Sequence, residues 1–247
     1  MIAESAVNWL HSGAPVVLGS YEDAGSGRTF VVARPADEPA LWQDYFRGAR
    51  RNYRRYGVEQ AVNFDEAATG ESTAVFVAAV DPNGQVVGGL RAQGPYSRVE
   101  QVYALREWAG RKGTDQLRKE LVQRMDEGVV EIKAVWVEHG AARHGELTTT
   151  MSRAFVHVLR LLQVRYALCT AASHALPRWR SSGGVVSTGV SPVPYPDERY
   201  LTWLMWWDRQ EISRLISADQ NWNMEREWQQ LLGSAARGHA TATPAAR

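Results

Sequence analysis

The chain has 247 residues, of which 45% are hydrophobic and 22% are charged, as in an ordinary globular protein. Its formal net charge of +1 provides no bulk attraction for a polyanionic partner such as nucleic acid. Cys169 is the single cysteine, which excludes an intramolecular disulfide and fits a reducing compartment.

Neither a signal peptide nor a membrane helix is indicated by the sequence. The start "MIAESAVNWLHSG" lacks a basic region and a long apolar core. The apolar run "YLTWLMWW" is far shorter than the roughly 20 residues that cross a membrane. We therefore expect a cytoplasmic protein without a membrane partner.

The first half of the chain begins with two predicted strands around a Gly-Ser turn, the second at about 29–34. Apolar residues at helical spacing then predict a helix over 41–56, which Gly57 ends. The tetrapeptide Asp-Pro-Asn-Gly at 81–84 is a strong turn signal, and it predicts a hairpin with strands near 74–80 and 85–92. Residues 99–109 and 114–127 have helical patterns.

The second half alternates strands and helices. "GVVEIKAVWVEHG" reads as a strand, the stripe over 147–163 as a helix, and "RYALCTA" as a short buried strand. A short helix and two further strands follow, the last being "RYLTWLMWWDR". No segment has the composition of a linker. We expect one domain over 1–207, a C-terminal helix over 208–232 and a disordered tail over 233–247.

The stretch "EIKAVWVEHGAARHGEL" joins a strand to a helix through a loop of small residues. Free N–H groups and the dipole at the start of a helix favour an anion. Gly140 and Gly145 allow close approach to the backbone, Arg143 can grip a phosphate with two N–H groups, and His144 can add a donor. The loop therefore predicts a phosphate site, the alternative being an ordinary solvated loop. The nucleotide P-loop pattern is absent from the sequence.

Four segments together resemble the GNAT-type N-acyltransferase superfamily. They are the hairpin "VFVAAVDPNGQVVGGLRA", the stretch "EIKAVWVEHGAARHGEL", the helix 147–163, and "YALCTAASHALPRWRSSGGVV". The resemblance spans about residues 28–207. Within the superfamily, the long first helix, the insertion at 95–128 and "PYPDERY" look most like acyl-homoserine-lactone synthases and long-chain N-acyl amino acid synthases.

The resemblance implies an α/β (α+β) fold, with a mixed, mostly antiparallel sheet, a splayed parallel strand pair and helices on both faces. Strand 131–137 would diverge from 166–170 and bind an acyl thioester there. It implies transfer of the acyl group from acyl-CoA, or from an acyl carrier protein, to a primary amine of a small molecule. The Val137 amide would polarise the thioester carbonyl. Phosphates of the donor would contact Arg143, His144, Gly145 and Glu146, and His174 would touch the cofactor.

The sequence departs from the family pattern at two places. The loop retains Arg143 and Gly145 but not the later glycine spacing, and Glu146 adds a negative charge near the expected phosphate. Many members place a tyrosine on the short helix as the acid for the leaving thiolate, where this chain has Trp179. Another group then supplies that proton, no acid is needed, or the activity is lost. A non-catalytic protein that binds acyl-CoA or a protein partner is therefore the alternative function.

Two residues are candidates for the base that accepts the proton of the amine. Glu131 matches a glutamate of the homoserine-lactone synthases, and His139 lies nearer to the expected thioester. Cys169 lies mid-strand without an evident base and is expected to act as a small hydrophobe. The histidines show no paired ligand spacing, so no metal site is expected.

The segment "RGARRNYRRYG" carries five arginines and two tyrosines. The favoured interpretation is the solvated face of an amphipathic helix. Docking of an acidic acyl carrier protein or acidic substrate comes next, and nucleic acid is the least favoured partner. A nucleic-acid site would require these arginines to gather on one exposed face.

Overall fold

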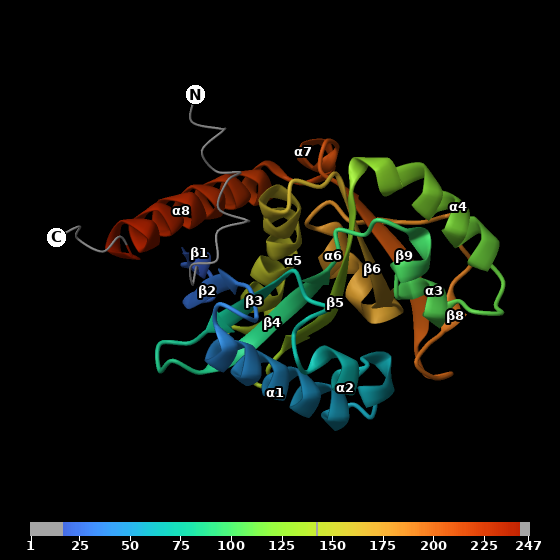
Figure 1. Ribbon diagram of the computed structural model, residues 1–247, viewed down its shortest axis with the longest axis horizontal. Coiled ribbons are helices and arrows are strands. Elements are labelled where there is room, and N and C mark those ends of the chain that lie inside the picture. Colours follow the sequence, from blue (N-terminus) through green and yellow to red (C-terminus); the bar gives the residue numbers. More distant parts are fainter. Residues whose placement is uncertain (1–16, 142, 243–247) are drawn as a thin grey trace.

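The computed structural model describes residues 17–141 and 143–242. Their strands form one mixed sheet in the order β1-β2-β3-β4-β5-β6-β9-β7, with β8 paired to β9 (Figure 1). Neighbouring strands are antiparallel except for β5 and β6, which are parallel. The strands are β1 Val17–Asp23, β2 Arg28–Ala33, β3 Val75–Val80, β4 Val86–Gln93, β5 Val129–Val137, β6 Tyr166–Ala172, β7 Val185–Val186, β8 Val193–Pro194 and β9 Leu201–Asp208.

Helices cover both faces of this sheet (Figure 1). Helices α5 and α8 lie on one face, whereas α1 and α4 lie on the other. The described α-helices are α1 Pro39–Arg55, α2 Phe64–Ala67, α3 Ala104–Glu107, α4 Thr114–Arg124, α5 His144–Leu161, α6 Leu176–Arg180, α7 Ile212–Leu215 and α8 Ala218–Ala242. The fold class expected from the sequence is confirmed.

The predicted hairpin is present as β3 and β4. Asp81 follows the first strand, and its Oδ1 accepts hydrogen bonds from the amides of Asn83 and Gln85, each at 2.9 Å. Gly84 has φ +81°, a conformation that glycine adopts without steric cost. The turn therefore fixes the register of the two central strands.

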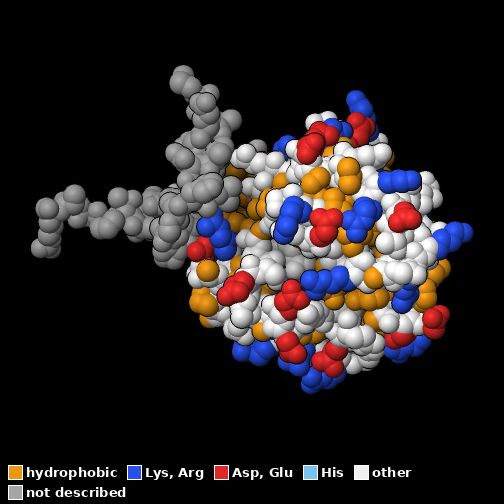
Figure 2. Space-filling view, turned by 45° about the vertical axis from the view of Figure 1, so that its right-hand side comes forward, with side chains coloured by type: hydrophobic (Ala, Val, Ile, Leu, Met, Phe, Trp, Pro, Cys, Tyr) orange, Lys and Arg blue, Asp and Glu red, His pale blue; other side chains and the backbone are white. Residues whose placement is uncertain are grey.

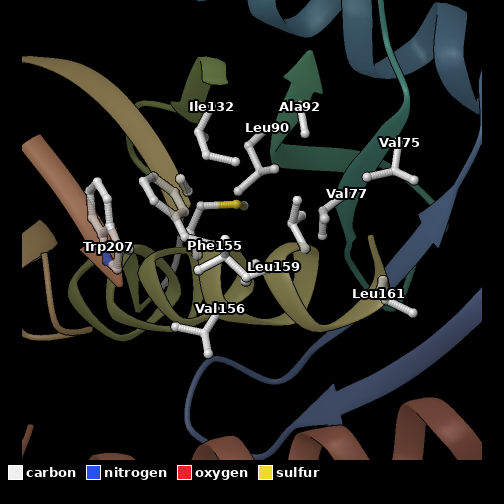
Figure 3. Packing of buried hydrophobic residues seen from close by; sticks show 14 of the residues in the cluster. Val75, Val77, Leu90, Ala92, Ile132, Phe155, Val156, Leu159, Leu161 and Trp207 are labelled. Atoms are coloured by element: carbon white, nitrogen blue, oxygen red, sulfur yellow. The ribbon is translucent and has the colours of Figure 1, made fainter. Parts of the chain in front are cut away.

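The main core lies between the sheet and α5. The helix stripe predicted from the sequence is buried, and Phe155 and Leu159 lie beneath Leu90 and Ile132 of the sheet (Figure 3). Phe155 also packs against the Trp207 ring, with centroids 4.9 Å apart. This packing places the first turn of α5 next to the end of β5.

Strands β5 and β6 pair only at their starts. The register ends at Glu131 opposite Leu168, although β5 continues to Val137 and β6 to Ala172. A bulge in β5 accompanies the separation, since Ala134 has φ 49° and the register with β4 shifts there. Bulges bend a strand and increase its twist, which turns the end of β5 away from β6. The predicted divergence of these two strands is confirmed.

The C-terminal boundaries differ from the prediction. Residue 208 ends β9, and the long helix starts at Ala218 rather than at 208. It continues to Ala242, through most of the segment 233–247 that was expected to be disordered. Alanines in that segment favour a helix, and the Ser234 hydroxyl donates to the Ser20 carbonyl at 2.9 Å. Residues 243–247 lie outside the described part of the chain.

Candidate active site

A cavity of about 510 Å³ lies where β5 and β6 diverge. This volume is within the usual range for a small-molecule or cofactor site. The apolar part of its wall includes residues of both diverging strands and Trp179. Its polar and aromatic lining includes Asn52, Tyr53, Tyr56, Glu107, Lys133, His144, Thr148, Thr170, His174, Arg178, Tyr195, Tyr200 and Thr202.

The end of β5 directs a backbone amide towards this cavity. The Glu138 amide donates to the Val87 carbonyl on the β4 side at 2.8 Å. Because consecutive residues of a strand direct their N–H groups to opposite edges, the Val137 amide faces the edge that β6 has left. Asn52 of α1 donates to the Val137 carbonyl at 3.0 Å, which helps to hold this segment. The amide can therefore donate to an oxygen bound in the cavity.

Helix α1 also fixes the bulge that opens the cleft. The Tyr45 hydroxyl donates to the Ala134 carbonyl at 2.9 Å, and the Tyr53 hydroxyl donates to the Val135 carbonyl at 3.3 Å. Side chains thereby satisfy carbonyl groups that would otherwise pair with a neighbouring strand.

One end of the cavity lies at the start of α5. The helix begins at His144, which lines the cavity, and Arg143 precedes it with φ 56°. The amides of the first turn have no partner within the helix. A methyl group at Gly145 would meet no atom within 4 Å, so the backbone there is open. The N-terminus of α5 therefore presents free backbone amides at this end of the cavity.

Arg143 and Glu146 are charged side chains beside this turn, and they lie close to each other. The Arg143 guanidinium donates to the Ala24 carbonyl at 3.3 Å, and its Nε lies 4.0 Å from Glu146. Both side chains are about half exposed, so they can be rearranged at little cost. Burial and then the charge of Arg178 lower the pKa of His144, which favours its neutral form.

The short helix α6 and the turn before it complete this end. His174 lines the cavity and its ring meets Tyr200, with centroids 6.3 Å apart. Trp179, at the place where the family often has tyrosine, is 8% exposed and packs on Phe155 with centroids 5.0 Å apart. An indole N–H is a donor but not an acid, so Trp179 acts here as part of the wall.

The two bases predicted from the sequence do not line the cavity. His139 is exposed, and its Nδ1 lies 3.2 Å from the Tyr56 hydroxyl, which does reach the lining. Glu131 is fully buried and accepts hydrogen bonds from the Tyr103 amide at 2.7 Å and the Tyr96 hydroxyl at 3.1 Å. Glu131 therefore lies behind the cavity wall, and His139 lies at the surface next to a lining residue.

A buried ion pair that sequence reasoning missed does line the cavity. Lys133 Nζ lies 2.5 Å from Glu107 Oε1 and 3.7 Å from Glu131 Oε1. Burial disfavours the ammonium, yet the two carboxylates raise the pKa of Lys133 above its ordinary value. Burial, opposed in part by Lys133, raises the pKa of Glu107. The only sequence signal was a lysine two positions after Glu131 inside a largely apolar strand.

Other predicted features can now be placed. Cys169 lines the cavity, and burial raises the pKa of its thiol to about 12, which disfavours the reactive thiolate. Within 17–141 and 143–242, no cluster of three or more His, Cys, Asp or Glu residues is arranged to hold a metal ion. Among the described helices, none combines the length and apolar character needed to cross a membrane.

The arginines of α1 are mostly engaged in ion pairs. Arg51 binds Glu138 at 2.8 Å, and Arg50 and Arg54 share Glu59 at 3.6 and 3.0 Å. On the face shown in Figure 2, basic and acidic side chains are interspersed without a continuous patch of either sign. These features favour the solvated-face interpretation of the arginine-rich helix over a nucleic-acid site.

Known proteins resemble this chain at two levels. Among solved structures, the acyl-homoserine-lactone synthase LasI gives a TM-score of 0.54 at 10% identity, covering 78% of this chain and 98% of that one. FeeM, an N-acyl amino acid synthase from uncultured soil microbes, gives 0.52 at 11% identity, covering 78% and 99%. At such low identity these likenesses establish a common GNAT-like fold, as the sequence resemblance implied.

Closer relatives are found among mycobacterial proteins, whereas no family model matches the chain. Uncharacterised proteins of Mycobacterium tuberculosis and Mycobacterium bovis are 41% identical over 202 residues, covering 82% of this chain and 77% of each relative. Identity at this level over most of both sequences means that the chain belongs to the same family as these mycobacterial proteins, and this family has the GNAT-like fold.

Proposed function

We propose that this protein is an N-acyltransferase that moves an acyl group from a coenzyme A thioester to a primary amine of a small molecule. The observation that carries the proposal is the cavity between the diverging strands, bordered by the Val137 amide. In the proposed reaction the amine nitrogen attacks the thioester carbonyl carbon, and the Val137 amide donates to the oxygen that becomes negative.

The donor phosphates are assigned to the N-terminus of α5. The first-turn amides, the open backbone at Gly145 and the nearby guanidinium of Arg143 support this assignment. Glu146 would turn towards Arg143, as it does here, so that its charge is balanced. His144 and His174, which line the cavity, would contact the pantetheine arm. The phosphopantetheine of an acyl carrier protein could occupy the same position.

Relatives of the fold guide the choice of acceptor. LasI is named as an acyl-homoserine-lactone synthase and FeeM as an N-acyl amino acid synthase. We therefore include amino acids and related small amines in the first acceptor screen. A primary amine must be neutral to attack, so a group that accepts its proton has to lie at the acceptor end of the cavity.

The alternative function is a non-catalytic protein that binds acyl-CoA or a protein partner. Trp179 favours this alternative because it cannot protonate the leaving thiolate as a tyrosine could. The two functions differ in turnover and not in binding. A protein that binds acyl-CoA but releases no CoA thiol with any amine would match the alternative.

The first experiment is thermal unfolding with acetyl-CoA, a long-chain acyl-CoA and free CoA. A ligand at 100 times its Kd stabilises the folded state by about 2.7 kcal/mol. For a chain of this size that is a shift on the order of 5–10 °C. Arg143→Ala should reduce the shift, whereas Arg214→Ala, at an exposed ion pair with Glu211, should not. An unshifted transition with all three ligands would reject the coenzyme A donor.

A second readout follows turnover. Release of the CoA thiol is measured with acetyl-CoA or octanoyl-CoA and a panel of primary amines, and the acylated amine is identified by mass spectrometry. Amine-dependent release supports the transferase. Release that is equal with and without amine would show hydrolysis instead.

A further inference from the structure

The cavity wall contains a buried carboxylate that no structural role fully accounts for. Glu107, the last residue of α3, is 2% exposed and lines the cavity. Its Oε1 accepts from Lys133, but its Oε2 is buried without a hydrogen-bond partner. An unpaired buried carboxylate oxygen is costly, so it indicates a missing proton or a missing cationic partner.

The charged groups around Glu107 also indicate a missing proton or cation. Glu107 and Glu131 share one ammonium group, that of Lys133. The nearby basic residue on β4, Arg91, is the strand partner of Lys133 but directs its guanidinium to the hydroxyls of Ser72 and Thr73, at 3.1 and 3.0 Å. The cluster beside the cavity therefore holds two carboxyl groups for one ammonium group, and with both ionised its negative charge would be balanced by a protonated amine.

The groups that face Glu107 come from several elements. The other titratable neighbours are Tyr53, Cys169 and Tyr195. Burial raises the pKa of each of them, so all three are uncharged near neutral pH. Thr170 of β6, which is uncharged, also lines the cavity. No other cation among these neighbours competes for Oε2.

We propose that Glu107 is the catalytic residue that binds the ammonium group of the acceptor amine and takes its proton, with Lys133 as its positioning residue. This inference rests on the proposed acyl transfer. It places the acceptor on the side of the sheet where α1 and α3 lie, whereas the donor phosphates would occupy the end formed by α5 and α6.

The proton balance of the reaction is complete with these groups. The ammonium transfers one proton to Glu107 and becomes a neutral amine. Its nitrogen then forms the C–N bond with the thioester carbon, and the C–S bond breaks as the amide forms. The second proton lost from nitrogen leaves with the sulfur as CoA thiol, and Glu107 releases its proton to solvent.

Burial makes Glu107 better suited to this task than an exposed glutamate. Its raised pKa brings the carboxyl group closer to neutral pH, where a general base is most effective. The Lys133 ammonium keeps the carboxylate form accessible despite burial. Glu131 also has a buried oxygen without a hydrogen-bond partner, Oε1, whereas its Oε2 accepts from Tyr96 and the Tyr103 amide. Unlike Glu107, it does not line the cavity, so its Oε1 is out of reach of a bound amine.

The test uses the full chain with octanoyl-CoA and three probe amines, namely phenethylamine, putrescine and tyrosine. Glu107→Gln should lower kcat by about 10²–10⁴-fold. It should leave the KM for octanoyl-CoA and the thermal shift with that ligand unchanged, while Glu107→Asp retains part of the activity. Equal kcat in Glu107→Gln and wild type would overturn the inference. So would a result in which Glu131→Gln loses activity and Glu107→Gln does not.

Two further variants separate a catalytic role from a structural one. Lys133→Met should move the acidic limb of the pH–rate profile to higher pH, because the carboxylate loses its neighbouring positive charge. A purely structural role of Lys133 would leave that limb in place. Glu107→Gln with Lys133→Met removes both charges together, so it tests the same loss of kcat if Glu107→Gln alone fails to fold.

Failure of this inference is distinguishable from failure of the proposed function. A wild-type protein that neither binds octanoyl-CoA nor releases CoA rejects the transferase, and the role of Glu107 with it. A wild-type protein that transfers the acyl group while Glu107→Gln does so equally well rejects Glu107 alone.

Discussion

A buried charge cluster joins helix α8 to the rest of the domain, and we expect this cluster to contribute strongly to the free energy of unfolding. Glu227 of α8 is fully buried, and its Oε1 accepts from two nitrogens of Arg153 on α5, at 2.6 and 2.8 Å. Asp23 of β1 also contacts Arg153, at 3.2 Å. The His157 ring lies 3.0 Å from Glu227.

The perturbation is Glu227→Gln, which retains the size of the side chain and removes its charge. Loss of one partner from a buried ion pair costs about 3–5 kcal/mol, because the other charge stays buried. Asp23 still compensates Arg153 in part, so we expect a loss of about 3 kcal/mol, near the lower end of that range.

The assay is urea unfolding followed by tryptophan fluorescence. With a slope of about 3 kcal/mol per molar urea, the midpoint should fall by about 1 M. The matched control is Glu225→Gln on the same helix, whose partner Arg160 is near the surface and whose own side chain is 49% exposed. An exposed pair contributes less than about 1 kcal/mol.

Two results would refute this reasoning. A Glu227→Gln midpoint equal to that of Glu225→Gln would show that burial does not strengthen the pair. Additive losses in the double variant with Arg153→Met would show that the two side chains act independently, since residues in contact should be coupled by more than about 0.5 kcal/mol.

Three further predictions concern the core and the cavity. Burial lowers the pKa of His157, so near about pH 6.5 the unfolded chain binds a proton that the folded chain does not. The free energy of unfolding, measured by chemical denaturation, should therefore fall as pH decreases through that value. A free energy of unfolding that does not change with pH in this range would contradict the prediction. Cys169 should react slowly with iodoacetamide at neutral pH, as followed by mass spectrometry, and labelling as fast as in the unfolded chain would exclude its burial. Gly48→Ala should destabilise the fold and weaken acyl-CoA binding in the thermal assay. The new methyl carbon would lie 2.2 Å from the ring of Trp136, which lines the cavity. Overpacking costs about 1–3 kcal/mol, whereas alanine in place of glycine stabilises a helix by about 1 kcal/mol. Gly145→Ala is the matched control for stability alone, since nothing lies within 4 Å of the added methyl group, and equal destabilisation by both variants would remove the role of Trp136.

Much of the fold could be read from local patterns. The Asp81–Gly84 turn specified a hairpin because the Asp81 side chain bonds the amides of the turn and Gly84 adopts the positive φ that the turn requires. The apolar stripe of α5 specified the buried face of that helix, since a period of about 3.6 residues places those side chains on one side. The C-terminal boundaries were predicted poorly, because the start of α8 at Ala218 and its packing on β1 have no strong local signal.

The sequence by itself determined the strands, the main helices, the GNAT-like resemblance and the loop at Arg143 and Gly145, because turn chemistry, hydrophobic period and short motifs act over a few neighbouring residues. Only the tertiary structure decided which titratable groups share the cavity. Glu107 and Lys133 are 26 positions apart and meet because the Tyr103 amide bonds Glu131 and so holds the start of α3 against β5. Glu131 is bonded by Tyr96 and the Tyr103 amide, and His139 lies beside Tyr56, so neither lines the cavity. Such contacts depend on how distant segments pack together.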